Sequence, residues 1–173
     1  MVKATLYSCI VSATLLLPGC GGGGTGNAVP LPMNTAIVIS ASLAPGLTKT
    51  TLPIKGIEVS FVLPQTASPI LDPDGSLRIG ETGLKNLNPN GLIPAGSYNP
   101  VTREVHFFLI NLSGDATNDL GTGDIARLTC NLSSGAQLSA QDIHPVFKVS
   151  GPGSVDISSE IVPSVSIVTY QKP

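Results

Sequence analysis

Apolar and polar residues alternate with a period of two in the first half of the chain. Between residues 37 and 43, and again between 57 and 63, every odd-numbered residue is apolar. Successive side chains of a strand point to opposite sides, so this alternation predicts two strands that each bury one face. Pro64 cannot donate a backbone hydrogen bond and is expected to end the second strand.

The middle of the chain predicts a short strand, a long loop and a central strand. Leu77 and Ile79 mark the short strand, which follows an Asp-Pro-Asp-Gly turn at 72–75. Asparagine, proline and glycine are frequent from 87 to 100, as is typical of a loop. The run 103–110 is long and bulky, and we expect it to form a central strand covered on both faces, or nearly so.

After a loop at 113–123, the stretch 124–132 alternates again. Its inward residues are expected to be Ala126, Leu128, Cys130 and Leu132, with Arg127, Thr129 and Asn131 outward. Later strands are expected to point Phe147 and Val149, then Val155 and Ile157, and finally Val165 and Ile167 inward. Short strands separated by turns are typical of two packed sheets, so the sequence predicts an all-β fold, a two-sheet antiparallel β-sandwich.

Composition supports this fold class and excludes one class of partner. The 173 residues include 19 glycines and 15 prolines, while charged residues make up only 12% of the chain. This balance favours short strands joined by turns over amphipathic helices. The formal net charge is −2, and the few positive charges are scattered, so we expect no nucleic-acid partner.

The N-terminus has the pattern of an export signal. Lys3 precedes a run from Leu6 to Leu17 that is apolar except for two serines and one threonine. A membrane-spanning helix needs about 20 apolar residues, whereas the apolar part of an export signal needs about 7–15. The run ends in Leu-Pro-Gly-Cys at 17–20, which resembles the lipobox of bacterial lipoproteins. That resemblance implies a lipoprotein signal peptide at 1–19 and a lipid on Cys20.

The residues after Cys20 agree with a lipid-bearing N-terminus. Four glycines follow at 21–24, and Pro30 and Pro32 come later, so we expect a Gly/Pro-rich tether at 20–34 and a folded domain at 35–173. The alternative is an ordinary secretory signal with a cysteine there by chance. With the lipid, the protein would lie in the bacterial cell envelope, at the outer membrane or cell surface, and the membrane would be a partner through Cys20.

The cysteines predict no disulfide in the mature chain. Cys9 lies in the signal and Cys20 would carry lipid, which leaves Cys130 without a partner. Because Cys130 shares the inward face of its strand with apolar residues, we expect it to be a buried packing residue.

The sequence does not indicate catalysis, a cofactor or a metal. It contains no Gly-x-Ser-x-Gly motif and no pair of histidines at metal spacing, so we do not expect an enzyme. We interpret His106 as a strand residue and His144, before Pro145, as the start of a strand. Asp72 and Asp74, and a second group of residues, could supply oxygen ligands to calcium. The same residue types also cap turns by bonding to their own backbone, and we favour this second interpretation. The second group is Asp115, Asn118, Asp119 and Asp124.

Three segments together resemble the cohesin-like domain. They are 54–64, the strand ending at 107–110, and 121–130 with its Gly-x-Gly-Asp start. The likeness covers roughly 35–170. It implies a nine-stranded sandwich of jelly-roll (cohesin-like) topology, related in fold to the family 2 and family 3 carbohydrate-binding modules. In cellulosomal members it also implies docking of a dockerin partner. No dockerin-contacting position is recognisable in this chain.

The aromatic residues bear on the choice of ligand. Sugar-binding sandwich modules present exposed aromatic rings that stack on sugar rings, and this chain has no tryptophan. By pattern, Phe61, Phe107 and Phe147 point inward, which leaves Tyr98, Phe108 and Tyr170 as surface candidates. Tyr98 lies among small polar residues in the predicted loop, so we expect it to be exposed and name it as the candidate ligand contact.

These observations predict a non-catalytic, lipid-anchored binding module of the cell envelope. Its ligand would be a protein partner, such as a dockerin-like protein, or an extracellular glycan. The alternatives are a carbohydrate-binding module linked to polysaccharide breakdown, a structural subunit of a surface assembly joined through edge strands, and a hydrolase without a familiar motif.

Overall fold

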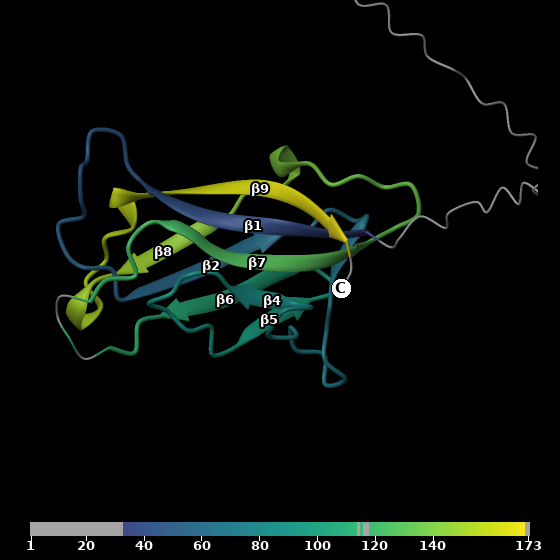
Figure 1. The fold of residues 1–173 in the computed structure, drawn as a ribbon, viewed down its shortest axis with the longest axis horizontal. Coiled ribbons are helices and arrows are strands. Elements are labelled where there is room, and N and C mark those ends of the chain that lie inside the picture. Colours follow the sequence, from purple (N-terminus) through teal and green to yellow (C-terminus); the bar gives the residue numbers. More distant parts are fainter. Residues whose placement is uncertain (1–32, 114, 116–117, 172–173) are drawn as a thin grey trace, which may run out of the picture. The chain divides into compact units, whose positions relative to one another are not determined.

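Figure 1 shows the protein as a computed structural model, which describes residues 33–113, 115 and 118–171. The secondary structure of these residues is mainly β. The strands are β1 (Met33–Leu43), β2 (Gly56–Val62), β3 (Ala67–Pro69), β4 (Leu84–Asn86), β5 (Gly96–Asn99), β6 (Glu104–Ile110), β7 (Gly123–Leu132), β8 (Val146–Ser150) and β9 (Ile161–Gln171). Short 3-10 helices are η1 (Ala140–Asp142), η2 (Pro152–Ser154) and η3 (Ser158–Glu160). Within these ranges, none of the helices has the length and apolar character that a membrane crossing requires.

The strands form two antiparallel sheets. Sheet A has the order β3-β7-β1-β9, and β4 pairs with β7 further along the strand edge that β3 occupies. Sheet B has the order β5-β6-β2-β8. In Figure 1, β9, β1 and β7 lie in one layer and β8, β2 and β6 in the other. The predicted all-β, two-sheet antiparallel sandwich is confirmed. Because β1 begins at Met33, Asn34 belongs to this domain rather than to the predicted tether.

A single apolar core lies between the sheets and contains residues of both. Ile37 and Leu128 from sheet A meet Val59 and Phe107 from sheet B, and all four are fully buried. Burial of such a side chain contributes about 1.5–3 kcal/mol. Most predicted inward residues are in this core: Ile37, Ile39, Ala41, Ile57, Val59, Phe61, Leu63, Ala126, Leu128, Cys130, Phe147, Val149 and Ile157. Leu43, Leu132, Val165 and Ile167 pack against it and are partly buried.

A β-bulge in β7 buries one residue that simple alternation places outside. Ile39 pairs with Ala126, whereas the next residue, Ser40, pairs with Asp124. Ile125 is therefore an extra residue on β7, and the local bend turns it toward the core, where it is buried beside Ala126.

Strand β6 is covered on one face only, so the prediction of two covered faces is wrong. Val105, Phe107 and Leu109 are buried, whereas the Phe108 side chain is 42% exposed. β6 does lie inside its sheet, between β5 and β2. The bulky outward residues of β6 therefore belong to an open sheet face, with no second layer of structure over it among the described residues.

The predicted strand at 77–79 is wrong. Leu77 is buried but Ile79 is 43% exposed, and each forms only an isolated bridge, to Leu71 and Leu84 respectively. The chain turns back directly afterwards, where Gly83 donates a backbone hydrogen bond to Gly80 (3.1 Å). This turn leaves no room for a longer strand.

The predicted loop at 87–100 contains a strand. β5 pairs with β6 in a hairpin, with Tyr98 opposite Val105. The side-chain oxygen of Asn99 accepts a hydrogen bond from the backbone N–H of Val101 (2.9 Å), which stabilises the turn between them. Four residues are too few for an alternating pattern, so the hairpin partner, rather than local sequence, defines this strand.

The predicted strand at 155–157 is also wrong. η2 and η3 flank this segment, and Val155 is exposed while Ile157 is buried. Gly153 and Ser154 both have a positive φ, at 66° and 62°, which turns the chain out of an extended path. The Ile157 N–H nevertheless donates to the Val149 carbonyl (2.9 Å), and this bond holds the segment against β8.

Candidate functional site

The outer face of sheet B presents ordered rows of side chains to solvent. Because side chains alternate along each strand, the residues that face away from the core align across β6, β2 and β8. Glu58 of β2 lies between Phe108 and Lys148 in this register. In the next row, Ser60 lies between His106 and Val146.

Large apolar side chains are exposed on this face. Phe108 is 42% exposed, Val62 48% and Val146 60%. Single exposed apolar residues are ordinary, but apolar residues on neighbouring strands of one sheet face are typical of an interaction site. The outer face of sheet B therefore exposes apolar side chains on three neighbouring strands.

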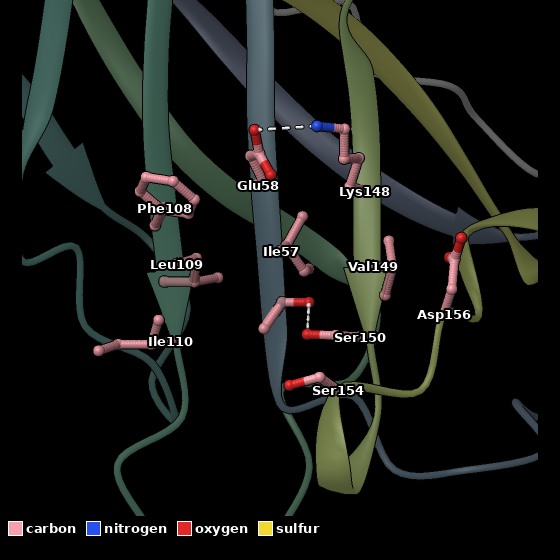
Figure 2. A pocket seen from close by; sticks show the side chains of 11 residues that line it. Ile57, Glu58, Phe108, Leu109, Ile110, Lys148, Val149, Ser150, Ser154 and Asp156 are labelled. Atoms are coloured by element: carbon pink, nitrogen blue, oxygen red, sulfur yellow. Dashed lines mark hydrogen bonds and ion pairs between the residues drawn. The ribbon is translucent and has the colours of Figure 1, made fainter.

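Charged residues lie at the centre of the same face. Glu58 accepts a hydrogen bond from the Lys148 ammonium (Nζ–Oε1 3.4 Å), and Figure 2 shows the two side chains turned toward each other across β2 and β8. Oε1 of Glu58 also lies 2.9 Å from Nε2 of His106. The His106 ring meets Phe108 edge-on, with 4.6 Å between ring centroids. These contacts hold one carboxylate and one ammonium beside an exposed aromatic ring.

The contacts also alter the acidity of Glu58. The hydrogen bond with His106 is the main cause that lowers the pKa of Glu58 below its ordinary value of 4.5, and Lys148 lowers it further. Glu58 is therefore ionised at neutral pH. The face offers a fixed negative charge with a positive charge beside it.

An open groove of about 340 Å³ crosses this face (Figure 2). Gly56 of β2 lies between Ile110 and Ser150 in the register, and a Cβ atom on Gly56 would be 2.8 Å from Ser150 Oγ. Glycine therefore keeps the floor of the groove open at this point. Side chains on the rim add hydroxyl, carboxylate and apolar groups: Glu58, Phe108, Ile110, Lys148, Ser150, Ser154 and Asp156.

Ser150 and His106 each have another hydrogen-bond partner near the groove. The Ser150 hydroxyl donates to the Gly56 carbonyl (3.5 Å), and the His106 side chain bonds to Glu58, so the two residues do not form a nucleophile–base pair. Across residues 33–113, 115 and 118–171, no group of three or more His, Cys, Asp or Glu side chains could hold a metal ion. The groove offers shape, apolar contact and charge.

Two cysteines carry predictions from the sequence. Cys20, the predicted lipidation site, lies outside the described residues. Cys130 is buried in the core as predicted, and burial raises the pKa of its thiol to about 12. Because the thiolate is the reactive form, we expect Cys130 to react poorly with thiol reagents in the folded protein.

The structure corrects the surroundings assigned to Tyr98. This residue lies in β5, not in an exposed loop, and its ring is half-buried against the core. It faces the interior opposite Val105, so it is not on the outer face of sheet B. The prediction that Tyr98 lies in an exposed loop is therefore wrong, and the groove does not include it among its lining residues. Its role as a ligand contact stays a prediction.

The three aromatic surface candidates do not gather on one face. Tyr170 lies on sheet A, where its hydroxyl is 2.8 Å from Oγ1 of Thr129 and its ring lies 4.9 Å from the Arg127 guanidinium. Of Tyr98, Phe108 and Tyr170, only Phe108 is on the outer face of sheet B. An aromatic platform is not formed by these three residues.

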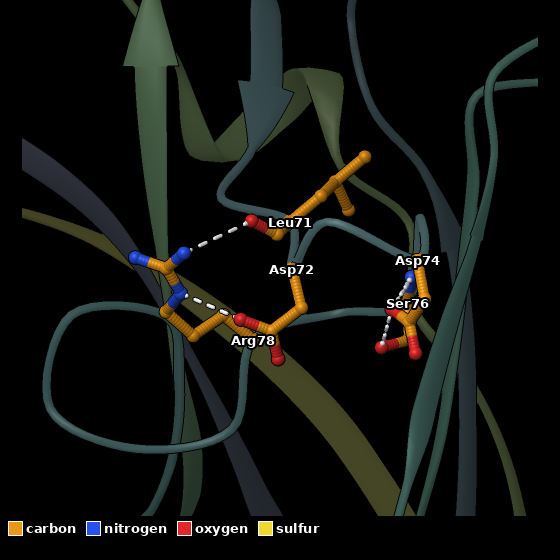
Figure 3. A network of polar contacts seen from close by, with 5 residues as sticks. All are labelled: Leu71, Asp72, Asp74, Ser76 and Arg78. Carbon is orange, nitrogen blue, oxygen red and sulfur yellow. Dashed lines mark hydrogen bonds and ion pairs between the residues drawn. The ribbon is translucent and has the colours of Figure 1, made fainter.

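The acidic turn at 72–75 binds its own chain. Arg78 Nε donates to Asp72 at 2.8 Å, and Asp74 accepts hydrogen bonds from the backbone N–H and the hydroxyl of Ser76 (Figure 3). The Ser76 hydroxyl bond is the main cause that lowers the pKa of Asp74. These are the contacts of a capped turn.

The second acidic group is engaged in the same way. The Asp119 carboxylate accepts from the backbone N–H of Ile54 (2.7 Å) and of Gly121 (2.9 Å), and Asp124 accepts from the Ser40 hydroxyl (2.7 Å). Asp115 and Asn118 contribute backbone carbonyls to Lys55. His144 is exposed just before β8, apart from both groups.

Reasoning from the sequence missed the residues that build the groove. Glu58 and Lys148 occupy outward positions of correctly predicted strands, but only the pairing of β2 with β6 and β8 brings them together with Phe108. No protein-family model, curated protein or solved structure matches this chain.

Proposed function

We propose that this protein is a non-catalytic, lipid-anchored module of the cell envelope that docks a protein partner through the outer face of sheet B. The observation that carries the proposal is the combination of exposed Phe108, Val62 and Val146 with the Glu58–Lys148 pair on one sheet face. Protein interfaces combine apolar side chains with charged and polar groups, and this face presents both. Docking of the cohesin-like type, with a jelly-roll strand order, is the form of this proposal that the sequence resemblance favours.

The arrangement of aromatic rings favours a protein over a flat glycan. Stacking on sugar rings requires several aromatic faces in one plane. Tyr98 is turned toward the core and Tyr170 is held against Arg127 on the other sheet. Phe108 on its own suits an apolar pocket or side chain of a protein better than a row of sugars.

The anchor is proposed from the sequence. The short apolar run, the Leu-Pro-Gly-Cys segment and the glycines after Cys20 support acylation of that cysteine. In this arrangement the sandwich is tethered at its N-terminal side, and its partner is held at the envelope.

A capture experiment tests the docking function. The full chain is immobilised and exposed to extracellular and envelope proteins of the source organism, beside an array of glycans. We expect one protein, identified by mass spectrometry, to bind the wild type and to be lost with Phe108→Ala, because truncation of an exposed aromatic anchor commonly costs more than about 1 kcal/mol of binding. Glu58→Gln should weaken capture, more so at low salt.

The matched control is Val101→Ala. Val101 is 89% exposed in the β5–β6 turn, away from the groove, so its truncation should leave capture unchanged. Equal capture by wild type and Phe108→Ala would refute docking through this face. Retention on a glycan that depends on Phe108 would instead support the carbohydrate-binding alternative.

A further inference from the structure

Strand β9 leaves one backbone edge without a strand partner in the described part of the chain. It is the end strand of sheet A and pairs only with β1. Figure 1 shows it in yellow along the border of its sheet. Such an edge carries N–H and C=O groups that are available to another strand.

The hydrogen-bond pattern identifies which residues face this free edge. The Ala44 N–H donates to the Glu160 carbonyl (2.8 Å), in line with the β1–β9 register. Hydrogen-bonded pairs alternate along an antiparallel ladder, so the even-numbered residues of β9 bond to β1. The backbone groups of Val165, Ile167 and Thr169 therefore point to the free edge. Pro163 also faces it, with a carbonyl but no N–H.

The sequence of β9 lacks the features that usually protect an edge. Its 11 residues contain no Lys, Arg, Asp or Glu, and Pro163 is its only proline. Natural edge strands are usually short, charged or interrupted. Pro163 protects one end, whereas the stretch from Ser164 onward has no such residue.

The same sequence is nearly symmetric about Val165. Residues 162–168 read Val-Pro-Ser-Val-Ser-Ile-Val. If two copies of β9 meet antiparallel at Val165, Val162 lies opposite Val168 and Ser164 opposite Ser166, twice each. Val165 then meets Val165 as a hydrogen-bonded pair, which is the position that its free backbone groups require. Like apolar and hydroxyl pairs stabilise such a contact, and no like charges oppose it.

We propose that β9 is a self-association edge at which two copies of this chain join sheet A to sheet A about a two-fold axis at Val165. The contact is isologous, so it closes as a dimer and does not propagate. It uses the opposite sheet from the groove and does not depend on the proposed docking function. η1 lies close to β9, but no backbone hydrogen bond joins these two elements.

Pairwise cross-linking tests both the contact and its register. Ser164→Cys and Ser166→Cys are made separately in the full chain carrying Cys9→Ser and Cys20→Ser, and the proteins are purified in detergent. Ser164 of one copy faces Ser166 of the other as a non-hydrogen-bonded pair, with Cα atoms about 4.5 Å apart, which a disulfide can bridge. Identical positions are diagonal neighbours about 7–8 Å apart, which is too far.

We expect oxidation of the mixed variants to give a covalent dimer of twice 17.7 kDa, while either variant alone stays a monomer on a non-reducing gel. Sedimentation of the parent protein should show a concentration-dependent dimer. A monomer at all concentrations, with no cross-link in the mixture, would overturn the proposal. If Ser164→Cys alone or Ser166→Cys alone cross-links as strongly as the mixture, the proposed register, with Ser164 opposite Ser166, is wrong.

Discussion

At the scale of single residues, burial and hydrogen bonding determine which side chains are available for chemistry. Cys130 is buried in the core without a polar partner closer than the Leu128 carbonyl at 3.9 Å. Glu58, by contrast, is half-exposed and bonded to two neighbours. The first is a packing residue, and the second lines the groove on the outer face of sheet B.

Replacement of the Cys130 thiol should destabilise the protein. Cys130→Ser places a hydroxyl among apolar groups, and we expect a loss of about 1–3 kcal/mol in the free energy of unfolding, measured by urea titration. Because the pKa of the thiol is raised to about 12, Cys130 should react with a thiol reagent only after unfolding in a chain with Cys9→Ser and Cys20→Ser. Fast labelling of the folded protein would show that Cys130 is accessible.

The lowered pKa of Glu58 predicts a pH dependence. A carboxyl whose pKa falls on folding stabilises the protein above its unfolded pKa of 4.5, and this contribution is lost as the pH falls through the lower folded pKa. Glu58→Gln should therefore cost less than about 1 kcal/mol at pH 7, as for other partly exposed pairs. The difference in the free energy of unfolding between Glu58→Gln and the wild type should vanish in acid.

The control substitution is Glu104→Gln, measured at pH 7. Glu104 lies on the outer face of sheet B, as Glu58 does, but has no ion pair among the described residues. Its replacement should change the free energy of unfolding at pH 7 less than Glu58→Gln does. If the free energy of unfolding of Glu58→Gln, plotted against pH, runs parallel to that of the wild type down to pH 2, the contacts of Glu58 with His106 and Lys148 do not lower its pKa.

At the scale of the elements, part of the outer face of sheet A is covered by its own side chains. Thr129 of β7 is 1% exposed although it points away from the core, because the Tyr170 ring of β9 lies over this part of the sheet. Arg127 stacks on the same ring and reaches Glu81 (3.2 Å). Sheet A therefore differs from sheet B, whose outer face is open.

Tyr170 should be more important for stability than Tyr98. Tyr170→Phe removes the hydroxyl contact with buried Thr129, and we expect a loss of about 1 kcal/mol. Tyr98→Phe is the matched control, because no hydrogen bond of the Tyr98 hydroxyl is found within the described residues, and it should change stability little. Equal effects in thermal unfolding would show that the Thr129–Tyr170 contact is not formed.

Strands were predictable from the sequence where alternation extends over several residues, as in β1, β2, β7 and β8. β5 was not, because a four-residue strand depends on its partner β6. The bulge at Ile125 and the turns at Gly80 and Gly153 change the direction of the chain without changing its apolar pattern. For this reason the strands predicted at 77–79 and 155–157 do not form.

At the scale of the whole molecule, the two outer faces of the sandwich expose different side chains, and the candidate site lies on that of sheet B. The outward positions of Glu58, Phe108 and Lys148 follow from the sequence of each strand. Their proximity does not, because it depends on the order β6-β2-β8, which residues distant in the chain establish together. Tyr98 was predicted to lie in a loop because its strand, β5, is likewise defined by its pairing with a neighbouring strand, β6.

The proposed anchor predicts the fate of the whole chain. Cys20→Ser should release the protein from membranes or leave an uncleaved precursor, which fractionation and the mass of the N-terminal peptide distinguish. A variant that still fractionates as an acylated membrane protein would exclude Cys20 as the site of lipidation.

Photo-cross-linking tests the docking face most directly. Benzoylphenylalanine replaces Phe108 on sheet B or, as the control, Val168 on the outer face of sheet A, and each protein is mixed with the partner found by capture and then illuminated. We predict a covalent adduct from position 108 and none from position 168. An adduct from position 168 alone would contradict docking through sheet B, and a glycan adduct at position 108 would contradict a protein ligand.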